Sequence, residues 1–477
     1  MPNYPDLKLY IGGHWRSTSD TMPVLNPSDE SVLGALPVAR QADLDDALSA
    51  AEQGLKVWSR TSPRERARVM LRASALLRER SEDVAYAISS ELGKPIRQAR
   101  LEVVRGCEFF EWDAGEAQRL YGRVIPSAPS IRYMTVRQPI GMVAAFSPWN
   151  FPMSQPARKV AGALAAGCSV ILKAAEETPG GAIHIAQAFH DGGLPPGVLN
   201  LVFGVPSEIS SYLIPQEQTR LIAFTGSTAV GIHLTSLAAR YVKPVLMELG
   251  GHAPVIVCDD VDPLRAGFLS ASRKLRNSGQ VCTSPTRFFV HERIFDRFVD
   301  AFVSQAKATV VGRALDEATD MGPVANARRL AALTAFSDDA VAKGARVLTG
   351  GRRMGQQGYF FAPTVLADVP DSARVMQEEP FGPMAIINRV GSLEEGIAQA
   401  NALPFGLAAY GLTHSAANVD KMIDGVEAGN LSINTLEASV AETPFGGVKA
   451  SGFGREGGEE GLWHYTVVKT VSHNMEL

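Results

Sequence analysis

The sequence predicts an α/β fold of doubly wound parallel sheets. Beyond Gly141, short apolar segments recur at intervals, and the expected strands are 141–146, 168–173, 198–203, 220–225, 244–249 and 254–258. Helical stretches separate these strands, at 153–166, 180–190 and 228–240. A second alternating block runs from Thr286 to about Ile433. Alternation of strands and helices predicts a parallel sheet covered on both faces.

The N-terminal third is predicted to be helical. Residues 43–58 carry one apolar face at helical spacing, made of Leu44, Ala47, Leu48, Ala51 and Leu55. A second helix begins with Ser62 as N-cap and Pro63 in its first turn, and ends near Gly93. A third helix is expected over 95–120.

A small β element is predicted from two distant segments. Residues 121–139 lose helical periodicity and are expected to form an extended hairpin. The final residues, 464–477, alternate in the manner of an edge strand. This terminal strand could pair with the hairpin of its own chain or of another copy.

Composition excludes several classes of function. A chain of 477 residues is long enough for two or three domains. Its formal net charge of −4 predicts no nucleic-acid partner and no binding to an anionic membrane. The first residues show no secretory signal, and the longest apolar stretch, 160–172, is too short to cross a bilayer. The four cysteines form no CxxC pattern, so reduced thiols in the cytoplasm are expected.

Cys282 is the candidate nucleophile. Cys107 is expected in a helix, Cys168 at the start of a strand and Cys258 within one, so inert packing accounts for these three. Cys282 lies instead in the polar loop NSGQVCTSP, which has no core periodicity. A thiol on such a loop can act as a nucleophile.

Two further residues follow predicted strands, where a doubly wound sheet binds its ligands. Glu248 ends an apolar strand and precedes two glycines, so it is a candidate general base with a pKa raised by partial desolvation. The alternative is a solvated acid at a strand end. Asn150, in SPWNFP, could donate its amide to a developing oxyanion, or could be a simple turn residue.

Two loops could hold a nucleotide. Residues 223–231 form a strand, a glycine turn and a helix start, whose amides suit a pyrophosphate, although the spacing is not GxGxxG. Residues 172–179 offer Lys173 and Glu176 after another strand. The Glu176 carboxylate could accept hydrogen bonds from both ribose hydroxyls and would repel a 2′-phosphate.

Together these segments resemble the aldehyde dehydrogenase superfamily, in order and over the length of the chain. The motifs that carry the resemblance are SPWNFP at 147, LKAAEETP at 172, FTGSTAVG at 224, MELGG at 247, NSGQVC at 277, EEPFGP at 378, NALPFGLAA at 401 and PFGGVKASGFGRE at 444. Any one could arise by chance, whereas eight in order are specific.

The resemblance implies a role for each matching residue. Cys282 is implied as nucleophile, Glu248 as general base, and Asn150 with the Cys282 backbone amide as oxyanion hole. The implied cofactor-binding residues are Trp149, Lys173, Glu176, Gly226, Ser227, Glu379 and Phe381. The reaction is oxidation of an aldehyde through a thioester on Cys282, with NAD preferred because of Glu176 and NADP possible. No metal is expected, and no His, Cys and Asp ligand cluster is visible.

The resemblance also implies a domain organisation. A cofactor domain is expected at 1–120 and 140–249, a catalytic domain at 250–450, and a bridging element at 121–139 and 460–477. A homodimer or homotetramer is implied, with the bridging element at its interface.

Within the superfamily, the sequence is most similar to semialdehyde dehydrogenases. Arg158, Arg276 and Ser439 match positions that bind the substrate carboxylate in succinate-semialdehyde enzymes, and an arginine fork suits a carboxylate. Arg276 could instead be a basic helix end at the surface. The stretch from Cys282 resembles the α-ketoglutaric semialdehyde group, and Ser284 replaces the second cysteine of a redox switch.

Three other functions stay open at this point. One is a broad-specificity dehydrogenase for uncharged aldehydes, in which both arginines face solvent. Another is a non-catalytic member of the same fold, which the retained Cys282, Glu248 and Asn150 disfavour. The last is an enzyme that passes its acyl group to coenzyme A, which the retained Glu248 disfavours.

Overall fold

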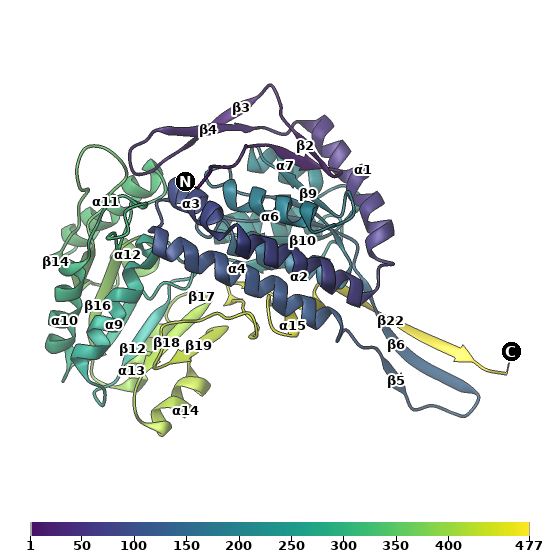
Figure 1. Ribbon diagram of the computed structural model, residues 1–477. Helices are drawn as coiled ribbons and strands as arrows, with labels where there is room; N and C mark the ends of the chain where they lie inside the picture. The colour runs from purple at the N-terminus through teal and green to yellow at the C-terminus, as the bar shows by residue number, and fades with distance from the viewer. Residues whose placement is uncertain (1, 477) are drawn as a thin grey trace.

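The computed structural model describes residues 2–476 (Figure 1). Met1 and Leu477, the outer ends of the predicted segments 1–120 and 460–477, lie outside the described residues. The chain forms two large sheets wrapped by helices, and a thin β arm that projects from the body (Figure 1). The predicted α/β class is therefore confirmed.

The first large sheet has eight strands in the order β2-β1-β9-β8-β7-β10-β11-β21. Its centre is parallel and consists of β7 (Met142–Phe146), β8 (Ser169–Lys173), β9 (Leu199–Val202), β10 (Thr219–Thr225) and β11 (Val245–Glu248). The antiparallel edges are β1 (Leu9–Ile11), β2 (His14–Arg16) and β21 (Gly452–Phe453). All five parallel strands were predicted, and each is found within three residues of its expected bounds.

The second large sheet has seven strands in the order β14-β15-β16-β13-β12-β18-β19. Its parallel strands are β12 (Pro254–Val257), β13 (Arg287–His291), β15 (Thr364–Ala367), β16 (Met384–Val390), β18 (Ala408–Leu412) and β19 (Asn430–Ile433). The edge strand β14 (Arg346–Thr349) is antiparallel. The chain thus changes sheet in the short segment between β11 and β12.

Helices surround both sheets. Those before residue 240 are α1 (Gln41–Trp58), α2 (Pro63–Glu79), α3 (Ser81–Leu92), α4 (Ile96–Ala117), α5 (Ser154–Ala166), α6 (Gly180–Asp191), α7 (Pro206–Leu213) and α8 (Thr228–Ala239). The later ones are α9 (Pro263–Leu275), the 3-10 turn η1 (Arg276–Gly279), α10 (Phe295–Ala308), α11 (Ala327–Ala342), α12 (Arg374–Gln377), α13 (Leu393–Asn401), α14 (Ala416–Gly425) and α15 (Glu460–Trp463). No helix within residues 2–476 is both long and apolar enough to cross a membrane.

The N-terminal third departs from the all-helical prediction in two places. Residues 9–37 form β1, β2, β3 (Thr21–Leu25) and β4 (Val32–Pro37), the last two as a separate hairpin. β1 and β2 are joined by Gly12 and Gly13, both at positive φ, as a tight two-residue hairpin loop requires. The expected helix 62–93 is two helices, because the backbone leaves helical geometry at Arg80.

The small β element has formed within one chain. β5 (Arg123–Ile125), β6 (Ile131–Pro139) and β22 (Thr466–Asn474) make a three-stranded antiparallel sheet. β22 pairs with β6 along its whole length, from Thr466 opposite Pro139 to Asn474 opposite Ile131. Figure 1 shows this arm extending away from the body beside the C-terminus. Elsewhere in the chain, β17 (Phe405–Gly406) and β20 (Val448–Lys449) form a separate antiparallel pair.

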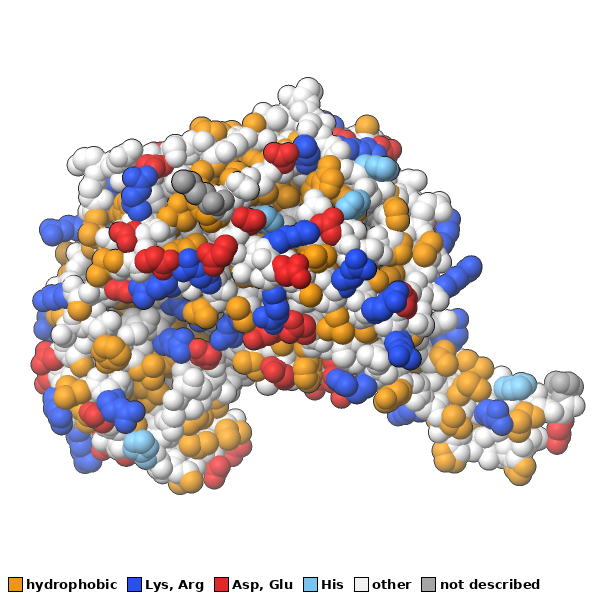
Figure 2. All heavy atoms as spheres, in the orientation of Figure 1, with side chains coloured by type: hydrophobic (Ala, Val, Ile, Leu, Met, Phe, Trp, Pro, Cys, Tyr) orange, Lys and Arg blue, Asp and Glu red, His pale blue; other side chains and the backbone are white. Residues whose placement is uncertain are grey.

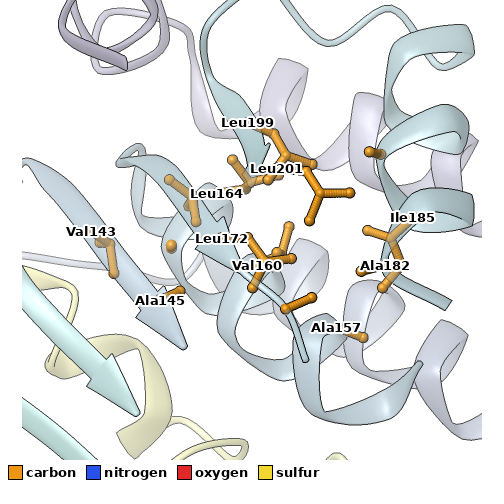
Figure 3. Packing of buried hydrophobic residues seen from close by; sticks show 14 of the residues in the cluster. Val143, Ala145, Ala157, Val160, Leu164, Leu172, Ala182, Ile185, Leu199 and Leu201 are labelled. Carbon is orange, nitrogen blue, oxygen red and sulfur yellow. The ribbon is translucent and has the colours of Figure 1, made fainter. Parts of the chain in front are cut away.

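The main core lies between the first sheet and its helices. Figure 3 shows α5 inserting Ala157, Val160 and Leu164 beside side chains of β8, β9 and α6. Every residue of α5 from Gln155 to Ala166 is buried. This helix nevertheless carries Arg158 and Lys159, and buried charges require partners.

On the face of the molecule drawn in Figure 2, acidic and basic side chains are interspersed.

Candidate active site

The loops that follow β7, β10 and β11 meet the loop before β13 around one cavity of about 530 Å³, here named the first cavity. The predicted site residues that line it are Trp149, Asn150, Gly226, Ser227, Glu248, Cys282, Glu379 and Phe381. Most of these residues end or follow strands of the first large sheet, whereas Cys282, Glu379 and Phe381 precede β13 and β16 of the second. The first cavity therefore lies at the carboxyl ends of strands of the first sheet, where a doubly wound sheet is expected to bind its ligand.

A smaller second cavity, of about 80 Å³, shares Cys282 with the first. It is lined by the remaining predicted substrate residues, Arg158, Arg276 and Ser439. The thiol side chain, which is partly exposed, thus stands at the junction of the two cavities. A molecule in the second cavity and one in the first could both reach this sulfur.

An unusual backbone carries Cys282 to this junction. Asn277 and Ser278 have φ of 49° and 54°, and Gly279 follows at φ 70°. A Cβ at Gly279 would collide with the carbonyl of Gly382, so only glycine fits there. Three successive left-handed residues are costly, and such backbone persists where the surrounding contacts fix it.

The Cys282 thiol holds its proton strongly. Burial is the main cause that raises its pKa well above the ordinary value, and the negative charge of Glu248 raises it further. The positive charge of Arg158 lowers the pKa of Cys282. The thiol must therefore lose its proton before the sulfur can attack, and the charge of Glu248 opposes that loss.

A pH profile of alkylation tests this electrostatic coupling. In Glu248→Gln, loss of the negative charge is expected to lower the pKa of Cys282, so iodoacetamide should label the thiol faster at about pH 8. Labelling at Cys282 can be followed by peptide mass spectrometry over a series of pH values. An unchanged profile would contradict the coupling between the two side chains.

Glu248, the last residue of β11, is only 3 % exposed. It is therefore not the solvated strand-end acid considered above. Burial is the main cause that raises its pKa, followed by the charge of Glu456, while Lys159 lowers it. A carboxylate whose pKa is raised is a stronger base than a solvated one, as a general base requires.

Asn150 is buried and anchored to the cysteine loop. Its side-chain nitrogen Nδ2 donates to the carbonyl of Gln280 at 3.0 Å. An amide nitrogen carries two protons, so one donor is left for the cavity that Asn150 lines. This anchoring distinguishes Asn150 from an ordinary turn residue.

The predicted cofactor residues fall into two groups. Gly226 and Ser227 line the first cavity at the N-terminus of α8, where backbone amides and the helix dipole favour an anion. Phe381 lies edge-on to Trp149, with 5.5 Å between the ring centroids. Glu379 also lines this cavity, and burial raises its pKa to about 8. These groups fit a bound dinucleotide with its phosphates at α8.

Lys173 and Glu176 form the second group. They make an ion pair with each other at the end of β8, and neither lines the first cavity. Lys173 is nevertheless the register partner of Phe146 on β7, immediately before the loop that bears Trp149. The pair therefore lies at the same edge of the sheet, beyond the wall of the first cavity.

Arg158 is held rigidly in the second cavity. Its guanidinium lies 4.0 Å from the ring centroid of Phe109 and 5.0 Å from that of Phe445, and it donates to Ser439 Oγ. Burial lowers the pKa of this arginine, and the charge of Glu456 opposes that effect. Stacking fixes the guanidinium plane and leaves its edge available for an anion.

Arg276 is half-buried at the same cavity, so the exposed helix end considered above does not describe it. Within residues 2–476 it forms no ion pair, whereas the neighbouring Glu437 pairs with Arg105 and Arg273. Burial, followed by the charges of Arg105 and Arg273, lowers the pKa of Arg276. A half-buried cation without an ion-pair partner is suited to binding an anionic group.

Arg105, on α4, is a residue of the second cavity that sequence reasoning missed. It donates to the carbonyl of Ser439 at 2.9 Å and to Glu437 at 3.0 Å. Arg105 is one of several charged residues of an amphipathic helix, and no local pattern distinguishes it from a solvated one. Its position depends on the packing of α4 beside the 436–439 segment, more than 300 residues away.

Comparison with known proteins agrees with this geometry. The Aldehyde dehydrogenase family profile matches residues 15–471. The chain belongs to the aldehyde dehydrogenase family. It is an enzyme that oxidises aldehydes with a nicotinamide cofactor, as members of this family do.

Aldehyde dehydrogenases from several bacteria are similar to it over nearly their whole length. The 4-(hydroxymethyl)benzenesulfonate dehydrogenase of Comamonas testosteroni is 46 % identical, with 95 % of each chain covered. The glutarate-semialdehyde dehydrogenase of Pseudomonas putida is 38 % identical, over 97 % of this chain and 96 % of the relative. A solved succinate-semialdehyde dehydrogenase of Burkholderia pseudomallei has a TM-score of 0.96 and 39 % identity, with 98 % of each chain covered.

Among residues 2–476, no cluster of three or more His, Cys, Asp or Glu side chains could hold a metal ion.

The four cysteines are free thiols, and only Cys282 is not fully buried. Cys282 is therefore the one cysteine of this aldehyde dehydrogenase whose thiol is accessible.

Proposed function

We propose that this aldehyde dehydrogenase oxidises an aldehyde that carries an anionic group, with succinate semialdehyde as the first candidate. The observation that supports this is the second cavity, in which Cys282 faces Arg158 and the unpaired Arg276. An anion held by two arginines would point its other end toward the thiol. Ser439, hydrogen-bonded to Arg158, would complete the set of donors.

The proposed reaction begins at Cys282. After the thiol loses its proton to water, the sulfur adds to the aldehyde carbon, and the resulting oxyanion accepts hydrogen bonds from Asn150 Nδ2 and the Cys282 backbone amide. A bound nicotinamide dinucleotide supplies the hydride acceptor for the next step. Loss of hydride leaves a thioester on Cys282, and Glu248 then deprotonates the water that hydrolyses it to the carboxylate.

For the cofactor we propose NAD, with NADP possible. Gly226 and Ser227 would bind the pyrophosphate, Glu379 the nicotinamide ribose, and Trp149 and Phe381 would pack beside it. Lys173 and Glu176 would hold the adenosine ribose, which requires their ion pair to open toward its hydroxyls. A carboxylate at that point repels a 2′-phosphate, which favours NAD.

We propose the following organisation for the chain. Residues 1–120 and 140–249 form the cofactor domain, and residues 250–450 form the catalytic domain. The bridging element, 121–139 and 460–477, joins copies of the chain into a homodimer or homotetramer in the cytoplasm. Its exposed apolar side chains, such as Val124 and Val468, support an interface on this arm.

A second candidate substrate is a sulfonate-bearing aldehyde. A relative named for a benzenesulfonate is 46 % identical, whereas the semialdehyde dehydrogenases above are 38 % and 39 % identical. A sulfonate is an anion that arginines bind as they bind a carboxylate. α-Ketoglutaric semialdehyde is a third candidate with the same anionic end, and an uncharged aldehyde would make no use of Arg276.

Replacement of Arg276 by leucine tests the anionic substrate. Loss of a hydrogen bond to a charged group costs about 1.5–3 kcal/mol, so kcat/KM for succinate semialdehyde should fall about 10- to 150-fold. For butanal, which has no charge, kcat/KM should stay within about twofold. Both rates are read from nicotinamide absorbance, in a panel that includes an aromatic sulfonate aldehyde.

Arg273→Leu is the matched control, because Arg273 lies one turn earlier, pairs with Glu437 and does not line the cavity. Its kcat/KM should stay within about twofold for both substrates. Equal losses for charged and neutral aldehydes in Arg276→Leu would reject the anion-binding role and favour a broad-specificity enzyme.

A further inference from the structure

Two fully buried charged side chains lie behind the loop that carries Asn150, and the proposed reaction does not use either. Lys94 stands between α3 and α4, and Glu102 lies on α4; their side chains are 1 % and 2 % exposed. They form an ion pair with each other. Burying two charges costs free energy even when they pair, and apolar side chains often stabilise such a site as well. Stability alone therefore does not explain why Lys94 and Glu102 are charged residues at this buried position.

The other hydrogen bonds of these two side chains, and the ring contact of Lys94, are all to residues 150–154, which lead from β7 into α5. Lys94 Nζ donates to the carbonyl of Asn150 at 3.1 Å and lies 3.9 Å from the ring centroid of Phe151. Glu102 Oε1 accepts hydrogen bonds from the backbone amides of Met153 at 2.9 Å and Ser154 at 3.2 Å. The pair thus holds both ends of the segment 150–154.

This segment is the wall between the two cavities. Asn150 lines the first cavity, whereas Phe151 and Ser154 line the second. The carbonyl of Asn150 also accepts a hydrogen bond from Asn277 at 3.0 Å, and its amide donates to Gln280 at 3.0 Å. A shift of the segment would therefore move the Asn150 amide relative to the cysteine loop.

Helix α5 has no cap of its own. Its N-cap, Met153, offers no side-chain acceptor, and Glu102 from α4 supplies one instead. Glu91 does the same for α6 by accepting from the amide of Gly180 at 3.0 Å. Glu91 and Glu102 are thus equivalent caps for two adjacent helices, but only Glu102 is linked through Lys94 to Asn150.

We propose that Lys94 and Glu102 are positioning residues that fix the Asn150 amide beside Cys282 and so set the oxyanion geometry. This inference rests on the proposed role of Asn150 as oxyanion donor. Lys94 anchors the backbone at Asn150, and Glu102 pairs with Lys94 and accepts from the backbone amides at the start of α5. Misplacement of a catalytic group by about 1 Å can cost about 100-fold in rate.

The test is a double-mutant cycle on the full-length enzyme with the variants Lys94→Met, Asn150→Ala and their combination. Lys94→Met should lower kcat about 10- to 100-fold and change the KM for the aldehyde by less than about threefold. In the Asn150→Ala background, Lys94→Met should lower kcat by no more than about a further threefold, because the group that it positions is already gone. Glu91→Gln, the matched control, should keep kcat within about twofold.

The outcomes of the cycle separate this inference from the proposed role of Asn150. If Lys94→Met lowers kcat by the same factor with and without Asn150, the pair does not act through Asn150 and the inference is overturned. If Asn150→Ala leaves kcat unchanged, the proposed oxyanion role fails, whatever Lys94→Met does. Should Lys94→Met not fold, Glu102→Gln takes its place in the cycle, because glutamine keeps an oxygen acceptor for Met153 and Ser154 but removes the charge that faces Lys94. Retention of full kcat by the folded variant would equally overturn the inference.

Discussion

Replacement of Cys282 by alanine is expected to lower kcat for aldehyde oxidation at least about 10⁴-fold, while the dinucleotide still binds. The Cys282 side chain lines both cavities, and no other described thiol lines either of them. Alanine removes the nucleophile and leaves the backbone amide and the first cavity in place. Nicotinamide absorbance measures turnover, and quenching of tryptophan fluorescence measures cofactor binding.

Cys258→Ala is the control for this experiment. Cys258 is buried, burial raises its pKa to about 11, and it lies outside both cavities. Its replacement should leave kcat within about twofold, with a modest loss of thermal stability. Substantial turnover in Cys282→Ala would show that another group attacks the aldehyde, and the proposed mechanism would have to be abandoned.

The parallel strands of the first sheet could be predicted because each is a short, mainly apolar run that ends in a loop with glycine or polar residues. β7, for example, is buried at all five positions and is followed at once by the loop of Asn150. The edge strands gave no such signal: β1 and β2 have three residues each, too few for a period to appear. The break at Arg80 also lacks a glycine or proline to mark it, so two helices were expected as one.

The site was predictable to the extent that its chemistry lies in local motifs. Asn150 stands in the loop after β7, Glu248 ends β11, and Cys282 lies in the loop before β13; the fold brings these three places together. Lys94, Glu102 and Arg105 could not be found in this way. They lie before the first sheet's central strands, in and beside a helix whose pattern indicates which residues are buried but not what they touch.

Glu248→Gln is expected to separate the two halves of the reaction. Glutamine has the shape of glutamate but cannot take a proton from water, so the thioester on Cys282 should form and then persist. Rapid mixing should give a burst of at most one reduced nicotinamide per subunit, followed by a steady rate about 10²- to 10⁴-fold below the native one. Mass spectrometry of the quenched protein should show the acyl group on Cys282.

The pH dependence provides an independent readout of the same residue. Burial raises the pKa of Glu248 above its ordinary value, so in the native enzyme the basic form is lost as pH falls through that raised pKa, and hydrolysis slows at a higher pH than for a solvated glutamate. In Glu248→Gln this acidic limb should vanish from the steady-state profile. If Glu248→Gln turns over at the native rate, another group activates the water. If its thioester is released only by coenzyme A, the acyl group has a different acceptor.

A second variant, Glu456→Gln, changes the pKa of the base without removing it. Glu456 raises the pKa of Glu248 while Lys159 lowers it, so Glu456→Gln should move the acidic limb toward lower pH without producing the burst.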